Sequence, residues 1–149
     1  MKRSTPFSLA SWRRDESGSS ALEFAIVCFP LILFMFGILE FGRAVWIEQA
    51  LQNTATAVAR CIGLQMASCT SGGAYSSSAT ATYATTIAQQ WDLTISSSNI
   101  NNVSTTATCG TSSASFAQVT LNYTFTQVTN LIPLLEGKTL TAQACFPMG

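Results

Sequence analysis

Histidine is absent from this chain of 149 residues, and charged side chains make up only 9% of it. Histidine is the usual general base near neutral pH and the commonest metal ligand, so few side chains here are suited to carry a proton through a reaction. With 7 basic and 7 acidic residues, the chain also lacks the net charge of a nucleic-acid-binding protein or of an acidic tail. We therefore expect a protein that is not an enzyme, binds no nucleic acid and uses no metal or cofactor.

The few charges are unevenly distributed along the chain. Four basic residues occur in the first fourteen positions, whereas the 89 residues from Cys61 onward hold only three charged side chains. Between these parts, the sixteen residues 24–39 contain no charge. The apolar character extends over residues 21–42, which cover about 33 Å in a helix, the hydrocarbon thickness of a bilayer. We expect one membrane-spanning helix here, since so small a chain cannot enclose an all-round apolar helix as a buried core helix.

The basic residues predict the orientation of this helix. Four of them precede the apolar run, namely Lys2, Arg3, Arg13 and Arg14, and only Arg43 follows it directly. Because basic flanks stay in the cytoplasm, we expect the N-terminus there and the residues from about 43 onward in the periplasm or outside the cell. A cleaved secretory signal is the alternative. However, the run exceeds the usual ~7 to 15 residues, and its end, EFGRAVW, offers no small-x-small cleavage site.

The join between the basic leader and the apolar run reads DESGSSALEF over residues 15–24. It resembles a type IV prepilin processing site, in which a peptidase cuts after a glycine and the fifth mature residue is a glutamate. The following sequence, ALEFAIVCFPLILFMFGILEFGRAVWIEQALQNTATAVARC, resembles the TadE-like proteins, which are minor pseudopilins of the bacterial tight-adherence (Flp) pilus system. The C-terminal sequence TLTAQACFP is similar to the end of that family. The resemblance covers the first third of the chain and its last tenth.

The resemblance implies which residues act in processing and assembly. Cleavage by a prepilin peptidase after Gly18 would make Ser19 the first mature residue and Glu23 the fifth. Glu23, followed by Phe24, would then pair with the new α-amino group of a neighbouring subunit when the apolar helices pack in a filament. A carboxylate at mid-membrane costs about 2.5 to 3.5 kcal/mol, and less near the interface, so Glu23 needs a partner there. The alternative is that Glu23 only reaches back to the cytoplasmic interface as the helix starts.

Pro30 lies inside the predicted membrane helix. Its missing N–H and its ring are expected to bend or loosen one turn. Such a kink either assists packing and extraction or is simply tolerated, as prolines in membrane helices are.

Beyond the apolar run, the helical pattern becomes one-sided. Apolar and small residues recur at steps of three and four: Ile47, Ala50, Leu51, Thr54, Val58, Cys61 and Ile62. This spacing predicts that the helix continues as an amphipathic segment that stops at Gly63. Residues 67–79 are small and polar and predict a loop, and a second helix with its aromatic residues in the core is expected over residues 81–91.

The C-terminal part has the alternation of β-strands. Apolar and polar residues alternate strictly over residues 118–126, and weaker strand patterns occupy residues 103–109 and 139–146. An antiparallel sheet of three or four strands covering the amphipathic helix is the simplest packing. We therefore expect an α+β, pilin-like fold. Its parts are a basic leader (1–18), a transmembrane helix (19–42), an amphipathic extension (43–64) and a periplasmic or extracellular helix-plus-sheet domain (65–149).

Four of the five cysteines lie outside the apolar run, which holds Cys28. In an oxidising compartment these four favour disulfides over a zinc site, since the chain has no C-x-x-C pair. Of the three possible pairings we favour Cys61 with Cys69, which closes a short turn, and Cys109 with Cys145, which joins two strands. Strand alternation places Cys109 in phase with the apolar face of its strand and Cys145 out of phase, so this pair needs a bulge or a different register.

The leading hypothesis for function is a minor pseudopilin, a structural or assembly component of a tight-adherence pilus. Its expected partners are a prepilin peptidase, other pilins and pseudopilins, the assembly machinery and the lipid of the bacterial inner membrane. The alternative is a permanently anchored single-pass module of the inner membrane that captures a ligand or an envelope protein with its periplasmic domain. Only the first role would also place the protein outside the cell, in the pilus.

Overall fold

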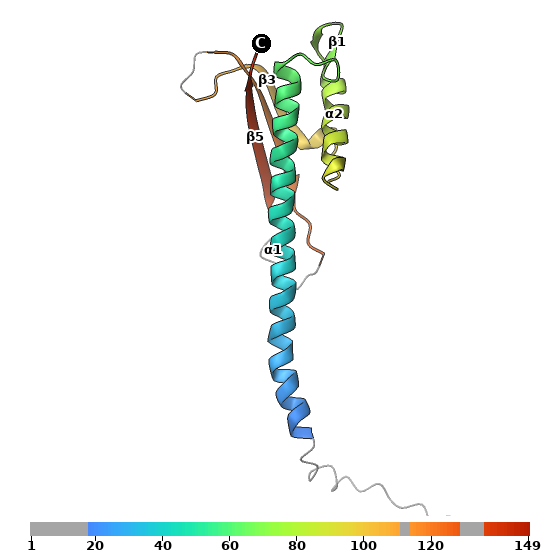
Figure 1. Ribbon diagram of the computed structural model, residues 1–149, viewed down its shortest axis with the longest axis vertical. Helices are drawn as coiled ribbons and strands as arrows, with labels where there is room; N and C mark the ends of the chain where they lie inside the picture. The colour runs from blue at the N-terminus through green and yellow to red at the C-terminus, as the bar shows by residue number, and fades with distance from the viewer. Residues whose placement is uncertain (1–17, 111–113, 129–135) are drawn as a thin grey trace, which may run out of the picture. The chain divides into compact units, whose positions relative to one another are not determined.

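The computed structural model describes residues 18–110, 114–128 and 136–149. The chain divides into two units, and the division falls within the first helix, between Leu39 and Glu40. The elements, shown in Figure 1, are α1 (Ser19–Gly63), β1 (Thr70–Ser71), β2 (Ala74–Tyr75), α2 (Ser77–Gln90), the 3-10 turn η3 (Ser97–Asn99), β3 (Ile100–Ala107), β4 (Phe116–Thr124) and β5 (Thr139–Pro147).

The part of α1 in the first unit is an exposed apolar helix. Large apolar side chains from Leu22 to Leu39 are exposed along it, and the helix is continuous through Pro30. By length and composition α1 is able to cross a membrane, and none of its most apolar stretch is buried within the chain. A helix that is apolar on all sides and covered by nothing in its own chain requires an apolar environment.

The rest of α1 carries the core of the second unit. All seven residues of the predicted amphipathic stripe are buried: Ile47, Ala50, Leu51, Thr54, Val58, Cys61 and Ile62. Steps of three and four residues keep side chains on one face of a helix with 3.6 residues per turn. Small residues such as Ala55 and Ala59 are buried beside them, which allows neighbouring elements to approach the helix closely.

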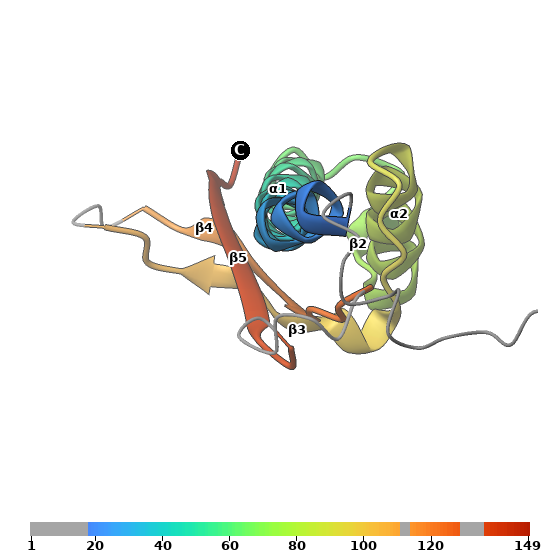
Figure 2. The ribbon, with the colours of Figure 1, turned by 90° about the horizontal axis from the view of Figure 1, so that it is seen from below.

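A three-stranded antiparallel sheet in the order β3-β4-β5 packs on this stripe. The central strand β4 buries Ala117, Val119 and Leu121, and its register with β5 is unbroken from Phe116–Pro147 to Thr124–Thr139. Figures 1 and 2 show the sheet and α2 on different sides of the second half of α1. The predicted α+β fold is confirmed: a long N-terminal apolar helix is combined with small antiparallel sheets.

The structure corrects the sequence analysis between α1 and β3. Residues 67–79, predicted as a loop, contain the two-stranded sheet β1-β2 and the start of α2. Gly72 and Gly73 connect the two strands with φ of 63° and 83°, values that suit a tight hairpin turn. Ser76 caps α2, because its Oγ accepts a hydrogen bond from the Ala79 N–H. Trp91, predicted to be in the core, instead caps the end of α2 with an exposed side chain.

Two disulfides join Cys61 to Cys69 and Cys109 to Cys145, the pairing that the sequence analysis favours. Cys61 and Cys69 are completely buried at the end of α1. Cys109 and Cys145 are both partly exposed. The first bond therefore belongs to the core and the second to the surface.

A bulge in β3 brings Cys109 to Cys145. Between Ser104 and Ala107, β3 contains one residue more than the part of β4 with which it pairs. One extra residue exchanges the two faces of a strand, so Cys109, which would otherwise share the inner face of Val103, lies on the outer face. Cys145 lies opposite Gln118, which alternates with buried residues of β4 and is therefore on the same outer face. The disulfide thus joins the segment just after β3 to β5, across the face of the sheet that α1 does not cover.

Gly63 is required by the close approach of β5 to the end of α1. A Cβ at this position would lie 2.5 Å from Phe146 Cδ1 and 2.8 Å from the Pro147 carbonyl oxygen. We predict that Gly63→Ala lowers the free energy of unfolding by about 1 to 3 kcal/mol, as overpacking does. Urea unfolding of the detergent-solubilised protein, followed by circular dichroism, measures this change. The matched control is Gly42→Ala in the same helix, where an added Cβ would meet no described atom outside the helix backbone within 4 Å. Equal destabilisation by both changes would contradict the prediction.

The two disulfides should differ in their sensitivity to reduction. A thiolate must reach a sulfur atom to break the bond, and only the Cys109–Cys145 bond is at the surface. With limited dithiothreitol, we expect Cys109 and Cys145 to be alkylated while Cys61 and Cys69 remain joined, as peptide mass spectrometry will show. In denaturant the difference should disappear. Earlier alkylation of Cys61 and Cys69 in the folded protein would be inconsistent with the burial described above.

Candidate functional site

The residues predicted to act in processing lie at the beginning of α1. Gly18 directly precedes the helix, Ser19 is its first residue, and both are exposed. A Cβ at Gly18 would meet no described atom within 4 Å, and the backbone here does not have the positive φ that favours glycine. The described part of the fold therefore does not require glycine at position 18. If glycine is required there, the requirement comes from another molecule.

Ser19 and Glu23 are brought together by the helix. The Ser19 hydroxyl donates a hydrogen bond of 3.4 Å to Glu23 Oε1, because residues four apart lie on the same face. Glu23 is exposed, and so is the neighbouring Phe24 side chain. A carboxylate therefore lies one turn from the first residue of the helix, with no part of the described protein covering it.

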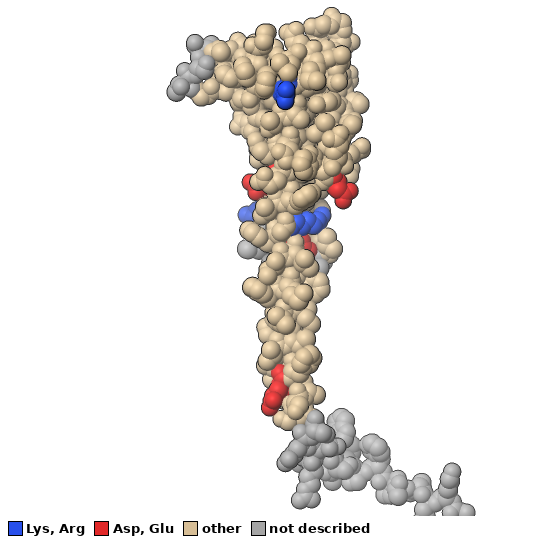
Figure 3. All heavy atoms as spheres, in the orientation of Figure 1, with Lys and Arg blue, Asp and Glu red and all other residues tan. Residues whose placement is uncertain are grey.

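The stretch after Glu23 has no charged side chain until Glu40. Figure 3 shows this surface of α1 free of acidic and basic groups on the face in view. Pro30 and the partly exposed Cys28, the one free cysteine among the described residues, lie within this stretch. The first unit thus offers an apolar surface with one carboxylate at its start.

Where the apolar run ends, α1 binds the segment that follows β4. Glu40 is buried, and its Oε1 accepts a hydrogen bond of 3.1 Å from the Val128 N–H. Arg43 donates to the Thr126 carbonyl at 2.8 Å, and its guanidinium lies 5.3 Å from the centroid of the buried Phe125 ring. Residues three apart share a helix face, so both side chains of the EFGR sequence hold one segment. The sequence alone identifies EFGR only as the end of the apolar run and does not predict these contacts.

Two tryptophans meet close to these contacts. Trp46 Nε1 donates a hydrogen bond of 3.3 Å to the Trp91 carbonyl, and the two rings lie edge to face with centroids 6.2 Å apart. This contact joins α1 to the C-terminal end of α2. Both rings remain exposed.

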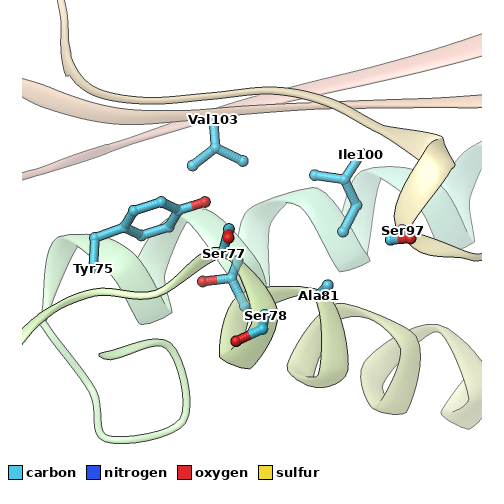
Figure 4. Close-up of a pocket in the computed structure, with 8 residues that line it drawn as sticks. Tyr75, Ser77, Ser78, Ala81, Ser97, Ile100 and Val103 are labelled. Carbon is cyan, nitrogen blue, oxygen red and sulfur yellow. The ribbon is translucent and has the colours of Figure 1, made fainter. Parts of the chain in front are cut away.

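A hollow of about 420 Å³ lies between the start of α2 and β3, as Figure 4 shows. Its lining is made of hydroxyl-bearing and aliphatic residues: Tyr75, Ser77, Ser78, Thr80, Ala81, Ser97, Ile100 and Val103. Burial raises the pKa of the Tyr75 phenol, although a hydrogen bond with the Thr80 side chain opposes this effect. The lining therefore contains no group suited to act as a base near neutral pH.

No group of three or more His, Cys, Asp or Glu side chains that could hold a metal ion occurs in the described part of the chain. The described functional features are instead those of the first helix. They are an exposed glycine, a carboxylate one turn into the helix and a long apolar surface.

Residues 18–60 match the family model described as TadE-like protein. The matched segment runs from the predicted processing site through the apolar helix and the EFGR sequence into the buried stripe of α1. No curated protein and no solved structure matches the chain. The match confirms the resemblance to the TadE-like proteins over residues 18–60 and associates this protein with the tight-adherence pilus machinery in general.

Proposed function

We propose that this protein is a minor pseudopilin of a tight-adherence pilus, processed between Gly18 and Ser19 and assembled through its apolar helix. One observation carries the proposal: an exposed glycine that the fold does not need is followed at once by an exposed apolar helix of membrane length. The TadE-like match over the same residues supports it. In this role the protein performs no reaction.

In the proposed topology, α1 crosses the bacterial inner membrane once with the N-terminus in the cytoplasm. The basic residues before the apolar run support this orientation, since such flanks remain on the cytoplasmic side. The second unit then lies in the periplasm, where its two disulfides are stable. The expected partners are the prepilin peptidase, other pilins and pseudopilins of the assembly machinery, and the membrane lipid.

Processing creates the charge that Glu23 is proposed to bind. Cleavage after Gly18 frees the α-amino group of Ser19, and a positive charge beside the carboxylate offsets the cost of holding it in an apolar environment. Within one chain, the Ser19 hydroxyl already contacts Glu23 at 3.4 Å, and the carboxylate is still exposed. In an assembly of parallel helices, the amine of a neighbouring subunit would complete the pairing.

The first test of this proposal is Gly18→Ala. The change should leave the fold intact, because the added Cβ meets no described atom, and it should cause the uncleaved precursor to accumulate. Mass spectrometry of the N-terminus of the protein from cells that carry the peptidase measures this, with Ser19 as the expected first residue of the unchanged protein. Gly42→Ala is the matched control and should be cleaved normally. Normal cleavage of Gly18→Ala, or an intact Met1 in the unchanged protein, would instead favour the permanently anchored module.

The second test is Glu23→Gln, which removes the charge and keeps the size of the side chain. Cleavage should continue, whereas incorporation into the pilus or its assembly complex should fall about tenfold, equivalent to about 1.4 kcal/mol for the lost ion pair. Quantitative immunoblotting of the sheared pilus and membrane fractions measures incorporation. Glu48→Gln, an exposed acidic residue on the same helix, is the control and should incorporate normally. Unchanged incorporation of Glu23→Gln would mean that Glu23 only reaches the cytoplasmic interface of the membrane and forms no ion pair needed for assembly.

A further inference from the structure

The end of the hydrocarbon layer falls inside the second unit. Residues 21–42 of α1 cover about 33 Å, which matches the hydrocarbon thickness of a bilayer. Trp46 is four residues beyond Gly42, or about 6 Å further along the helix axis. The headgroup region adds roughly 5 to 7 Å on each side of the hydrocarbon. If α1 spans the membrane, as the proposed function requires, the Trp46 backbone lies in the headgroup layer.

Large apolar side chains are exposed at this level of α1. The exposed fractions are 56% for Trp46 and 37% for Trp91. The two tryptophans are edge to face, 6.2 Å apart, and lie at the surface rather than in the core. Tryptophan is enriched at membrane–water interfaces because its ring is apolar while its N–H is polar.

The fold holds Trp91 beside Trp46, although 45 positions separate the two residues in the sequence. Trp91 is tied to Trp46 through its carbonyl, whereas Val128 is tied through its N–H to Glu40, about 9 Å before Trp46 along the helix axis. The Arg43 contacts with Thr126 and the Phe125 ring fix the same segment. The arrangement therefore does not depend on the flexibility of single side chains.

We propose that Trp46 and Trp91 form an interfacial patch, through which this end of the second unit contacts the headgroup layer of the membrane that α1 crosses. The patch binds the lipid surface through its apolar and aromatic side chains. It deepens the proposed function, because it rests on α1 spanning the membrane and gives the second unit a lipid contact of its own.

The charges near the patch do not favour an electrostatic attraction to anionic lipid. Figure 3 shows side chains of both signs gathered in this part of the second unit. Apart from Arg60, the charged residues of the second unit are four acidic and two basic: Glu40, Glu48, Asp92, Glu136, Arg43 and Lys138. Contact with zwitterionic headgroups through the tryptophans is therefore the binding mode, and about 1 M salt should not weaken it.

Quenching of tryptophan fluorescence by brominated lipids tests the patch. The full chain is placed in phosphatidylcholine vesicles with bromines either near the headgroups or near the chain ends. One variant keeps only Trp46 (Trp12→Phe with Trp91→Phe), and another keeps only Trp91 (Trp12→Phe with Trp46→Phe). Both should lose about half of their emission with the shallow bromines and less with the deep ones, as expected of residues at the interface.

Two control variants, built with all three native tryptophans changed to phenylalanine, separate the possible outcomes. Phe34→Trp, in the apolar run, should be quenched mainly by the deep bromines, and Tyr75→Trp, in the hairpin, by neither. Unquenched Trp46 and Trp91 together with a quenched Phe34→Trp would refute the patch and keep the membrane span. The same result would follow if a second protein copy covered the tryptophans. An unquenched Phe34→Trp would refute the span, and the patch with it.

Discussion

Burial of one stripe of α1, from Ala44 to Gly63, holds the second unit together, because the sheet and α2 bury their apolar residues against it. Burying a large aliphatic side chain contributes about 1.5 to 3 kcal/mol, and the stripe includes Ile47, Leu51 and Val58. Several other buried positions are alanines, which bring backbones close but add less apolar area. A unit of this size buries only a small apolar core. Its two disulfides add stability, because they limit the conformational entropy of the unfolded chain.

The same helix faces two environments, and the sequence marks the change. Up to Leu39 the large side chains are apolar on every side and exposed, whereas from Ala44 onward only one face is buried. Glu40 and Arg43 lie at this change, and their hydrogen bonds to Val128 and Thr126 hold the segment after β4 against α1 where the apolar run ends. The EFGR sequence is thus both the end of the apolar run and a structural contact.

Long regular patterns in the sequence predicted the fold well, and short elements were missed. The stripe of α1 was identified completely, because seven positions repeat at helical spacing. The predicted strand over residues 118–126 is displaced by two residues from β4, since Phe125 continues the apolar alternation after the pairing with β5 ends. The strands β1 and β2 have two residues each, which is too short for any periodicity. The start of α2 is rich in serine and threonine, which also favour loops.

For the candidate site, the sequence showed which residues share a local motif but not which distant residues meet. Gly18, Ser19 and Glu23 follow one another closely, so their spacing alone puts them on adjacent turns. The partners of Arg43 and Glu40 lie 83 and 88 residues away, and nothing in their local sequence indicates the contact. The bulge in β3 was anticipated only as a requirement of the second disulfide, because the extra residue has no sequence signal of its own.

The C-terminal residue lies beside the end of α1, because the Gly149 N–H donates a hydrogen bond to the Gly63 carbonyl. Along the helix axis, Gly63 is about 30 Å from Gly42, where the apolar run ends. A fluorescent protein or affinity tag fused after Gly149 would therefore emerge well away from the end of the apolar run. Labels attached there leave residues 19–42 of α1 unobstructed.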